Sequence, residues 1–194
     1  MVEEKELDGL IVFETKVFND ERGYFMESYN EKMFNQNVLE HFSFKQDNIS
    51  CSKKNVLRGL HFQAPPFEQG KLIQVLRGKV IDVVVDIRKK SKSYGKYFKI
   101  ELSDKNHKQL WVPPGFAHGF LTLDDETIFS YKCTNHYSKN HEMDLLWNDK
   151  NLSIDWGIET NQRVSCNSAI SRISISPSRN INTIQERIYS CEWF

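Results

Sequence analysis

The sequence predicts an all-β protein, built as a barrel or a sandwich of short strands. Short runs rich in β-branched and aromatic residues follow one another at close spacing, with turn residues between them. The run 80–87 also alternates with a period of two, which is typical of a strand with two different faces. One face is aliphatic, whereas the other carries Asp82 and Asp86 between valines, and an apolar core does not tolerate unpaired carboxylates. We therefore interpret this run as one wall of a polar pocket inside the fold.

Predicted strands follow one another along the chain as far as residue 134, with one short helix among them. Asn30 is a suitable N-cap, because its side chain can accept a hydrogen bond from the first helical turn, and it predicts a helix over Glu31–Leu39. The proline-containing segment 113–119 predicts a tight turn that presents His118. Besides the central stretch 55–88, we predict strands over 10–17, 24–29, 44–50, 97–102, 108–113, 119–123 and 128–134.

Composition limits the classes of function. A chain of 194 residues is expected to form one domain with a substantial core. Its formal net charge is zero, which gives no electrostatic reason to expect nucleic-acid or membrane binding. The charged N-terminus lacks the apolar segment of a secretory signal, so we expect a cytoplasmic protein. The cysteines are scattered without a CxxC pair and are expected to be free thiols, at positions 51, 133, 166 and 191.

The last part of the chain differs from the rest. We expect a main domain over residues 1–160 and an atypical tail over 161–194, rich in Ser, Asn, Ile and Arg as far as Asn182. One interpretation is a surface segment with poor local order. The other is an arm that packs on the domain or on a partner subunit.

Polar residues near the predicted pocket favour proton transfer without a metal. The pattern Pro-x-Gly-x-x-His that ends at His118 is frequent in cupins, where the histidine is often a metal ligand. Such a site also needs a His-x-His pair, and here the corresponding place reads His61-Phe62-Gln63, with glutamine a poor ligand for transition metals. An imidazole can instead abstract a proton from an acidified carbon, and a phenol opposite it can return one. A lysine can stabilise an enolate oxygen, and a carboxylate can keep that lysine charged. We therefore predict epimerisation beside a carbonyl.

Several motifs resemble, in order and spacing, the RmlC family of dTDP-4-dehydrorhamnose 3,5-epimerases. They are ArgGlyLeuHisPheGln from residue 58, GlnGlyLysLeuIleGln from 69, TrpValProProGlyPheAlaHisGlyPhe from 111 and TyrLysCysThrAsnHisTyr from 131. The resemblance runs from about Phe13 to Trp156. It implies a cupin-type double-stranded β-helix, or jelly roll, with short flanking helices. It also implies a homodimer, no metal or other cofactor, and a nucleotide-linked 4-keto-6-deoxy sugar as substrate. The ketone at C4 would acidify the protons at C3 and C5.

The resemblance also implies roles for individual residues. His61 matches the base and Tyr131 the acid, Lys71 matches the residue near the C4 oxygen, and Asp82 matches a supporting carboxylate. Arg58 matches a cation near the reacting sugar and the diphosphate. The remaining matches are expected to bind substrate, some of them from the partner subunit, at Arg22, Phe25, Glu27, Gln46, Asn48, His118, Tyr137 and Glu142.

One departure from the family concerns the catalytic histidine. Members of the family carry a tail aspartate that hydrogen-bonds it, and an orienting carboxylate of this kind fixes the imidazole tautomer. Here Ser168 stands at that position, and no aspartate follows Asp155. Three interpretations remain open: another acid substitutes, with Glu159 the nearest in sequence; only one carbon is epimerised; or activity is weak or absent.

Alternative functions fit the same sequence less completely. One is a mono-epimerase of the same type, acting at C3 or C5 of a related substrate, such as a GDP-linked 4-keto-heptose. A ketoisomerase of similar fold would move the carbonyl instead of inverting a centre. A non-catalytic sugar-nucleotide-binding cupin would account for the missing tail aspartate, and a metal-dependent cupin oxygenase is the most distant alternative.

Overall fold

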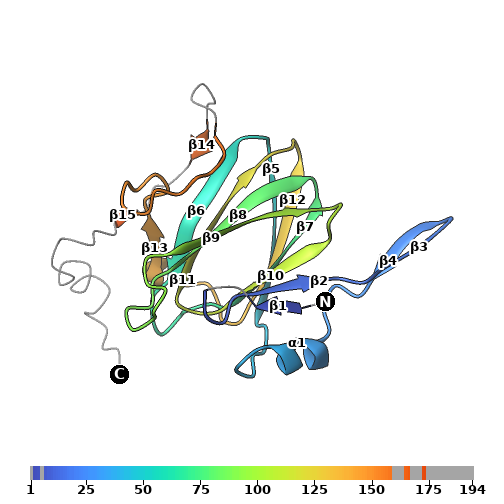
Figure 1. Cartoon of the computed structure of the whole chain (residues 1–194), viewed down its shortest axis with the longest axis horizontal. Coiled ribbons are helices and arrows are strands. Elements are labelled where there is room, and N and C mark those ends of the chain that lie inside the picture. The colour runs from blue at the N-terminus through green and yellow to red at the C-terminus, as the bar shows by residue number, and fades with distance from the viewer. Residues whose placement is uncertain (1, 5–6, 159–163, 167–171, 174–194) are drawn as a thin grey trace.

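The computed structural model describes residues 2–4, 7–158, 164–166 and 172–173. Two mainly antiparallel sheets lie face to face as a cupin-type jelly roll, which confirms the predicted all-β fold (Figure 1). Flanking helical structure in these residues is limited to α1 (Glu31–Asn37) and the 3₁₀ turn η1 (Lys139–His141). Within the same ranges, no helix has the length and apolar character needed to cross a bilayer.

The first sheet contains six strands and ends at an open edge. Its order is β1 (Val2–Glu4), β2 (Ile11–Glu14), β10 (Lys108–Val112), β7 (Lys71–Arg77), β12 (Thr127–Cys133) and β5 (Gln46–Ser52). The strand β5 forms one edge, beside β12, and β1 forms the other.

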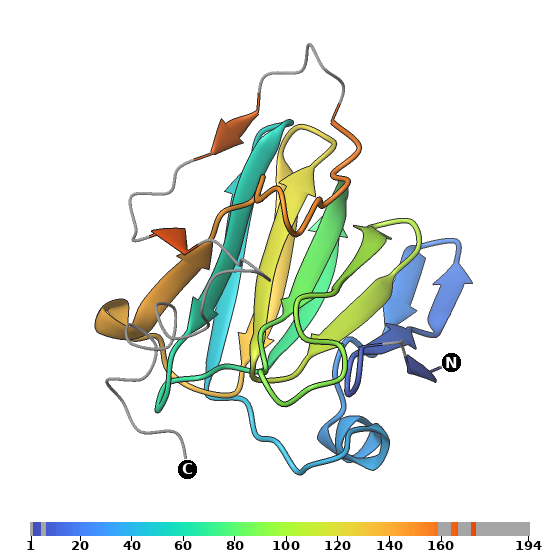
Figure 2. The same cartoon turned by 60° about the vertical axis from the view of Figure 1, so that its left-hand side comes forward.

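The second sheet contains seven strands, including two short pieces from the C-terminal region. Its order is β15 (Arg172–Ile173), β13 (Glu142–Leu145), β6 (Val56–Gln63), β11 (Phe116–Thr122), β8 (Lys79–Asp86) and β9 (Tyr97–Ser103), with β14 (Ser165–Cys166) also paired to β6. Figure 2 shows β13 running beside β6, as the strand register requires. The described pieces of the predicted tail therefore pair with the main domain.

Period-two alternation places apolar side chains in layers on both sides of the second sheet. On β8, Val80 and Val84 face the core between the two sheets. Val83 and Val85 face outward, where the segment after β13 covers them with residues such as Leu152 and Trp156. The alternation predicted for this strand is confirmed, because its two faces enter two separate clusters.

The helix α1 covers the outer face of the first sheet. It begins after Asn30, whose side-chain oxygen accepts a hydrogen bond from the Met33 amide at 3.1 Å, as predicted. Phe34 is buried against Trp111, with ring centroids 4.9 Å apart in a T-shaped arrangement. The helix is shorter than predicted, because the chain becomes extended at Val38.

Two local predictions were wrong. The run 10–17 is not one strand: β2 ends at Glu14, and the chain leaves the sheet to form a hairpin of β3 (Val17–Asp20) and β4 (Gly23–Met26). His118 does not lie in a turn. The turn ends at Gly115, with a φ of +89°, and from Phe116 onward the chain pairs with β8, so His118 lies within β11.

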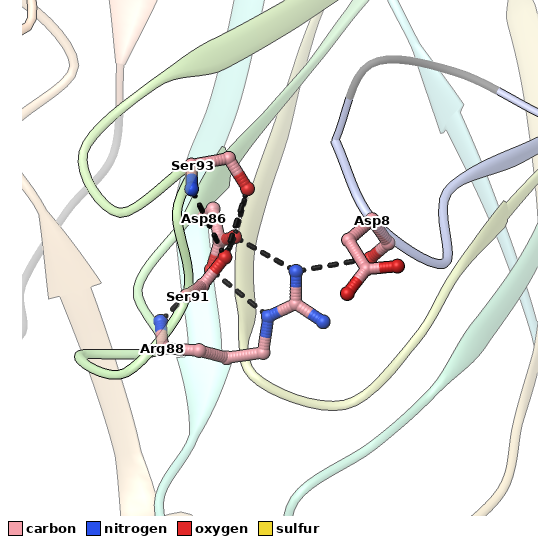
Figure 3. Close-up of polar contacts among 5 residues, drawn as sticks. All are labelled: Asp8, Asp86, Arg88, Ser91 and Ser93. Atoms are coloured by element: carbon pink, nitrogen blue, oxygen red, sulfur yellow. Dashed lines mark hydrogen bonds and ion pairs between the residues drawn. The ribbon is translucent and has the colours of Figure 1, made fainter.

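The other acid on β8, Asp86, ends the strand in a cluster of hydrogen bonds (Figure 3). Its carboxylate accepts hydrogen bonds from Arg88 and from the hydroxyls of Ser91 and Ser93, and Arg88 also donates to the carbonyl of Asp8. Burial alone would raise the pKa of Asp86, but these donors outweigh burial and hold the pKa below its usual range. Asp86 therefore fixes the end of β8 and does not face the pocket.

The free-thiol prediction is confirmed where the structure can test it. Cys51 is exposed and Cys133 is buried, and neither forms a disulfide. The side chains of Cys166 and Cys191 lie outside what the structure describes.

Candidate active site

A pocket of about 510 Å³ lies between the two sheets. Most of the residues predicted as catalytic line it, together with side chains from both sheets. Its floor includes Phe120 of β11 and Phe129 of β12, whose rings stack across the two sheets with centroids 3.9 Å apart. The lining includes Ser50, Cys51, Ser52, Arg58, His61, Lys71, His118, Tyr131, Glu142 and Ser165.

The alternation of β7 and β12 accounts for Lys71 and Tyr131. On β7, Lys71 shares a face with the core residues Ile73 and Val75, and on β12, Tyr131 shares a face with Phe129. The Lys71 ammonium lies 5.8 Å from the centroid of the Tyr131 ring. The same inward faces therefore supply core side chains at one end and polar side chains at the other.

A bulge in β6 brings Arg58 and His61 to the pocket together. Residues three apart on a regular strand face opposite sides, but the β6–β11 register shifts between His118 and Phe120, opposite Gly59. Both Arg58 and His61 then line the pocket, and the Arg58 Nε donates a 3.1 Å hydrogen bond to the Ser52 hydroxyl.

His61 pairs with an aspartate that sequence reasoning missed. Its Nδ1 lies 2.6 Å from Oδ1 of Asp144, the residue directly opposite His61 in the β13–β6 register. The His61 side chain is 32% exposed, whereas that of Asp144 is 1% exposed. The carboxylate therefore lies behind the imidazole, and the imidazole faces the pocket.

A second histidine and aspartate lie beside the first pair. The His118 Nε2 lies 2.9 Å from Oδ2 of Asp82, and both side chains are buried. Burial lowers the pKa of His118, and the nearby Lys71 and His61 side chains lower it further, although Asp82 acts in the opposite direction. The predicted carboxylate Asp82 is therefore present, and its hydrogen bond goes to His118.

Burial also changes the titration of Lys71 and Tyr131. It lowers the pKa of the Lys71 ammonium, while Cys133, Asp82 and Glu142 act to raise it. Burial raises the pKa of the Tyr131 phenol, so the hydroxyl keeps its proton at neutral pH. A phenol that stays protonated can donate a proton to substrate.

Four predicted binding residues form a network of hydrogen bonds between β5 and β13, and of these four Glu142 lines the pocket. Gln46 donates to the side-chain oxygen of Asn48 at 2.9 Å and accepts from the backbone amide of Tyr137 at 3.0 Å. The Tyr137 hydroxyl donates to Glu142 at 2.7 Å, and Glu142 lines the pocket. These contacts raise the pKa of Tyr137, chiefly through the hydrogen bond to Glu142.

The other three predicted binding residues do not join the pocket of their own chain. Arg22 lies at the tip of the β3–β4 hairpin, where it pairs with Asp20 at 2.6 Å. Phe25 is 69% exposed on the same hairpin, and Glu27 follows it. The hairpin projects away from the two sheets (Figure 1).

The signal that could have revealed Asp144 is local alternation. In the run 142–145, Glu142 and Asp144 share one face and Met143 and Leu145 share the other. That pattern shows an inward acid but not its partner, because the contact joins residues 83 apart in sequence. No three His, Cys, Asp or Glu side chains in the described part of the chain are grouped so that they could hold a metal ion.

Comparisons with known proteins agree with this arrangement. The profile of the dTDP-4-dehydrorhamnose 3,5-epimerase family matches residues 4–173. A dTDP-4-dehydrorhamnose 3,5-epimerase of Shigella flexneri is 51% identical over 154 residues, which are 79% of this chain and 85% of that protein.

Solved structures extend the similarity to the fold. The Legionella pneumophila enzyme in complex with dTDP-4-keto-L-rhamnose is 41% identical, with a TM-score of 0.82 over 86% of this chain and 87% of that one. The Bacillus anthracis dTDP-4-dehydrorhamnose 3,5-epimerase with TDP and pyrophosphate bound is 45% identical, with a TM-score of 0.79 over 82% of this chain and 91% of that one. From its sequence, its fold and the residues of its pocket, the chain belongs to the dTDP-4-dehydrorhamnose 3,5-epimerase family.

Proposed function

We propose that this epimerase converts a dTDP-linked 4-keto-6-deoxyglucose to the corresponding 4-keto-rhamnose, by inverting C3 and C5. The observation that carries the proposal is the position of two proton-transfer groups on opposite sheets. His61 enters the pocket from β6 of the second sheet, and Tyr131 enters from β12 of the first. A sugar ring bound between them meets a base on one face and an acid on the other, as inversion requires.

Each chemical step has a residue suited to it. The C4 ketone acidifies the neighbouring C–H, and His61 removes that proton to give an enolate. Lys71 stabilises the negative charge on the C4 oxygen, in a site where burial strengthens electrostatic interactions. Tyr131 then protonates the carbon from the opposite face. Arg58, held by Ser52, is placed to bind the diphosphate.

The substrate class is supported by the relatives. The Legionella pneumophila structure contains dTDP-4-keto-L-rhamnose, and the Bacillus anthracis structure contains TDP. We extend this ligand chemistry to the present chain because Arg58, His61, Lys71 and Tyr131 all line one pocket.

A homodimer is part of the proposal. Three of the predicted nucleotide-binding residues lie on or beside the β3–β4 hairpin, which does not reach the pocket of its own chain. The hairpin carries the exposed aromatic residues Phe18, Tyr24 and Phe25. An exposed apolar group of this kind is suited to contact with a second subunit. Sedimentation equilibrium is expected to give twice the chain mass of 22.8 kDa.

The cytoplasmic location expected from the sequence also belongs to this proposal. It is supported by the free thiols of Cys51 and Cys133 and by the nucleotide-linked substrate.

Proton NMR in D₂O tests the reaction directly. With dTDP-4-keto-6-deoxyglucose, the purified protein is expected to replace the C3 and C5 protons with deuterium and to form the epimerised product. His61→Asn is expected to abolish both exchanges while leaving dTDP binding in place. Exchange at one carbon would identify a mono-epimerase. Binding of dTDP without any exchange would refute the proposal and support the sugar-nucleotide-binding alternative.

A further inference from the structure

His61, which lines the pocket, makes a short hydrogen bond to Asp144, and the proposed reaction gives Asp144 no role. We propose that Asp144 is the positioning residue for His61: it holds the proton on Nδ1 and leaves the lone pair of Nε2 for the substrate. This inference rests on the proposed function, because it assigns Asp144 a role in the same proton transfer. The first support is the 2.6 Å distance from Nδ1 to Oδ1, between residues that face each other in the β13–β6 register.

The chemistry of the two groups fixes the direction of this hydrogen bond. An ionised carboxylate can only accept, so Nδ1 of a neutral imidazole must be the donor. The proton of the neutral ring is then on Nδ1, and Nε2 is the nitrogen able to accept a proton. When His61 takes a proton from substrate, the buried negative charge of Asp144 stabilises the imidazolium that forms.

Asp144 also depends on His61, because its carboxylate is buried. Asp144 is 1% exposed, and its second oxygen, Oδ2, finds no hydrogen-bond partner among the described residues. A buried carboxylate is costly without a partner, so the contact with His61 compensates the burial of this group. Because His61 itself is 32% exposed, the pair is buried on the aspartate side and open on the histidine side.

The strand that carries Asp144 is fixed by packing on its other face. Leu145 is 4% exposed and packs with Leu152 and Trp156, and Met143 packs against the same cluster. Alternation then directs Asp144 inward, toward β6. A carboxylate on a packed strand is held more precisely than one on a loop.

The neighbouring pair is arranged differently. His118 contacts Asp82 through Nε2, whereas His61 contacts Asp144 through Nδ1. The His118 side chain is 7% exposed, and burial lowers its pKa. Of these two histidines, His61 is the one that combines exposure to the pocket with a carboxylate on the far ring nitrogen.

The same assignment provides a carboxylate for His61 although position 168 is a serine. One of the three interpretations that the sequence leaves open is that another acid replaces the tail aspartate, with Glu159 the nearest in sequence. Both Glu159 and Ser168 lie outside the described residues. Asp144 supplies the carboxylate from β13, 24 positions before Ser168 in the sequence.

Two substitutions of Asp144 test whether it positions His61, and not whether it binds substrate or maintains the fold. In Asp144→Asn, the charge is lost with little change of shape, and in Asp144→Leu no acceptor remains. Both variants are expected to lower the rate of deuterium exchange by at least about 100-fold, since a comparable change beside a catalytic histidine has cost about 10⁴-fold. The dissociation constant for dTDP, measured by calorimetry, is expected to stay within about twofold of wild type, because Asp144 does not line the pocket.

A spectroscopic measurement gives a readout that a purely structural role would not change. Nitrogen-15 NMR of the His61 ring, assigned by comparison with His61→Asn, is expected to show a protonated Nδ1 and an unprotonated Nε2 in the wild type. In Asp144→Leu the proton is expected to move to Nε2. The matched control is Asp149→Asn, another buried aspartate, which accepts backbone hydrogen bonds in a turn outside the pocket. It is expected to leave exchange and tautomer unchanged.

Outcomes separate the two proposals. Exchange within about threefold of wild type in both folded Asp144 variants would overturn the positioning role while leaving the epimerase proposal intact. A wild-type His61 protonated on Nε2 would also overturn it. If wild-type protein itself exchanges no proton, the proposed function fails first.

Discussion

Several polar side chains in and beside the pocket lie on the inward faces of strands. Lys71, Asp82 and His118 all lie on strand faces that elsewhere bury valine, isoleucine or phenylalanine. Each has an oppositely charged or hydrogen-bonding neighbour that offsets part of the cost of burial. The pocket is thus built from the same alternation as the core, with polar side chains at selected positions.

Tyr131→Phe is expected to stop epimer formation while proton removal by His61 continues. Without the phenol, His61 can still remove and return a proton on its own face, so deuterium exchange continues. Formation of the epimer is expected to fall by at least about 100-fold, the contribution of a general acid. The measurement is NMR of both exchange and product. The control Tyr97→Phe changes a tyrosine on β9 whose hydroxyl accepts a hydrogen bond from the backbone amide of Asp155 outside the pocket, and it is expected to match wild type. Equal loss of exchange and product in Tyr131→Phe would contradict the acid role.

His118 is expected to make stability depend on pH. The groups that face it are Asp82, Lys71 and His61, and the net result is a folded-state pKa below the ordinary value of 6.5. The unfolded chain therefore binds an extra proton below about pH 6.5, and folding stability decreases as the pH falls through that value. One proton corresponds to a slope of at most about 1.4 kcal/mol per pH unit.

Urea unfolding between pH 7.5 and 5.5 measures this slope. In His118→Gln, which can still hydrogen-bond Asp82, the slope is expected to be smaller than in wild type. Identical slopes in the two proteins would show that His118 does not titrate in this way.

Among the elements, the bulge in β6 has the most effect on the site. Gly59 has a φ of +118°, and a Cβ atom there would lie 2.5 Å from Cα of Gly119 and 2.6 Å from the carbonyl of His118. Both neighbours are backbone atoms and cannot move aside. Gly59→Ala is therefore expected to destabilise the fold by about 3 kcal/mol and to misalign Arg58 and His61.

Chemical denaturation and dTDP binding test this prediction together. Gly95→Ala is the control, because Gly95 also has a positive φ, +76°, but a Cβ atom there would meet no other atom within 4 Å. It is expected to cost only about 1 kcal/mol and to leave binding unchanged. Similar losses of unfolding free energy in the two variants would show that the backbone around Gly59 relaxes to accept a Cβ atom.

The cluster at the end of β8 predicts a structural role for Arg88. Arg88→Met removes the guanidinium that donates to the buried Asp86 but keeps an apolar side chain over Phe116, whose ring centre lies 4.3 Å from the guanidinium carbon. We expect a loss of about 3 kcal/mol above pH 4. The folded-state pKa of Asp86 is lowered, so its stabilising contribution disappears as pH falls through that pKa, and the difference from wild type narrows there.

A matched exposed pair provides the comparison for Arg88. Arg77 and Glu126 form an ion pair at 3.1 Å, but their side chains are 61% and 68% exposed. Arg77→Met is expected to change the free energy of unfolding by less than about 1 kcal/mol in the same denaturation series. Equal effects of the two substitutions would argue against a structural role for the buried cluster.

At the scale of the whole molecule, the sequence predicted the fold and most of the pocket. The alternation of β8 predicted a strand with an inward acid, and His61, Lys71, Tyr131 and Arg58 do meet in one cavity. The position of His118 was mistaken because proline and glycine signals mark where a turn starts, whereas pairing with β8 decides where it ends. Asp144 was missed because its partner is set by the pairing of β13 with β6, which no local pattern reveals.

The proposed dimer predicts complementation between inactive variants. His61→Asn lacks the base but has an intact hairpin, whereas Arg22→Ala has the base and an altered hairpin. If each hairpin serves the partner's pocket, mixed dimers contain one complete pocket. Random reassociation of equal amounts should then restore about a quarter of the pockets.

Epimer formation measured after mixing tests this prediction. Mixing His61→Asn with Tyr131→Phe is the negative control, because both of those changes affect the pocket itself. Activity that stays at the level of the separate variants would place the hairpin outside the site.

The position of Asp144 on β13 also bears on how this protein can change over evolutionary time. Every group assigned to proton transfer lies between His61 and Asp144, so selection for the proton-transfer steps acts on that span. Sequence beyond it no longer has to deliver a carboxylate to the histidine. The C-terminal region is thereby released from one catalytic constraint, and a Ser- and Asn-rich stretch such as that from Gln162 to Asn182 is compatible with the reaction.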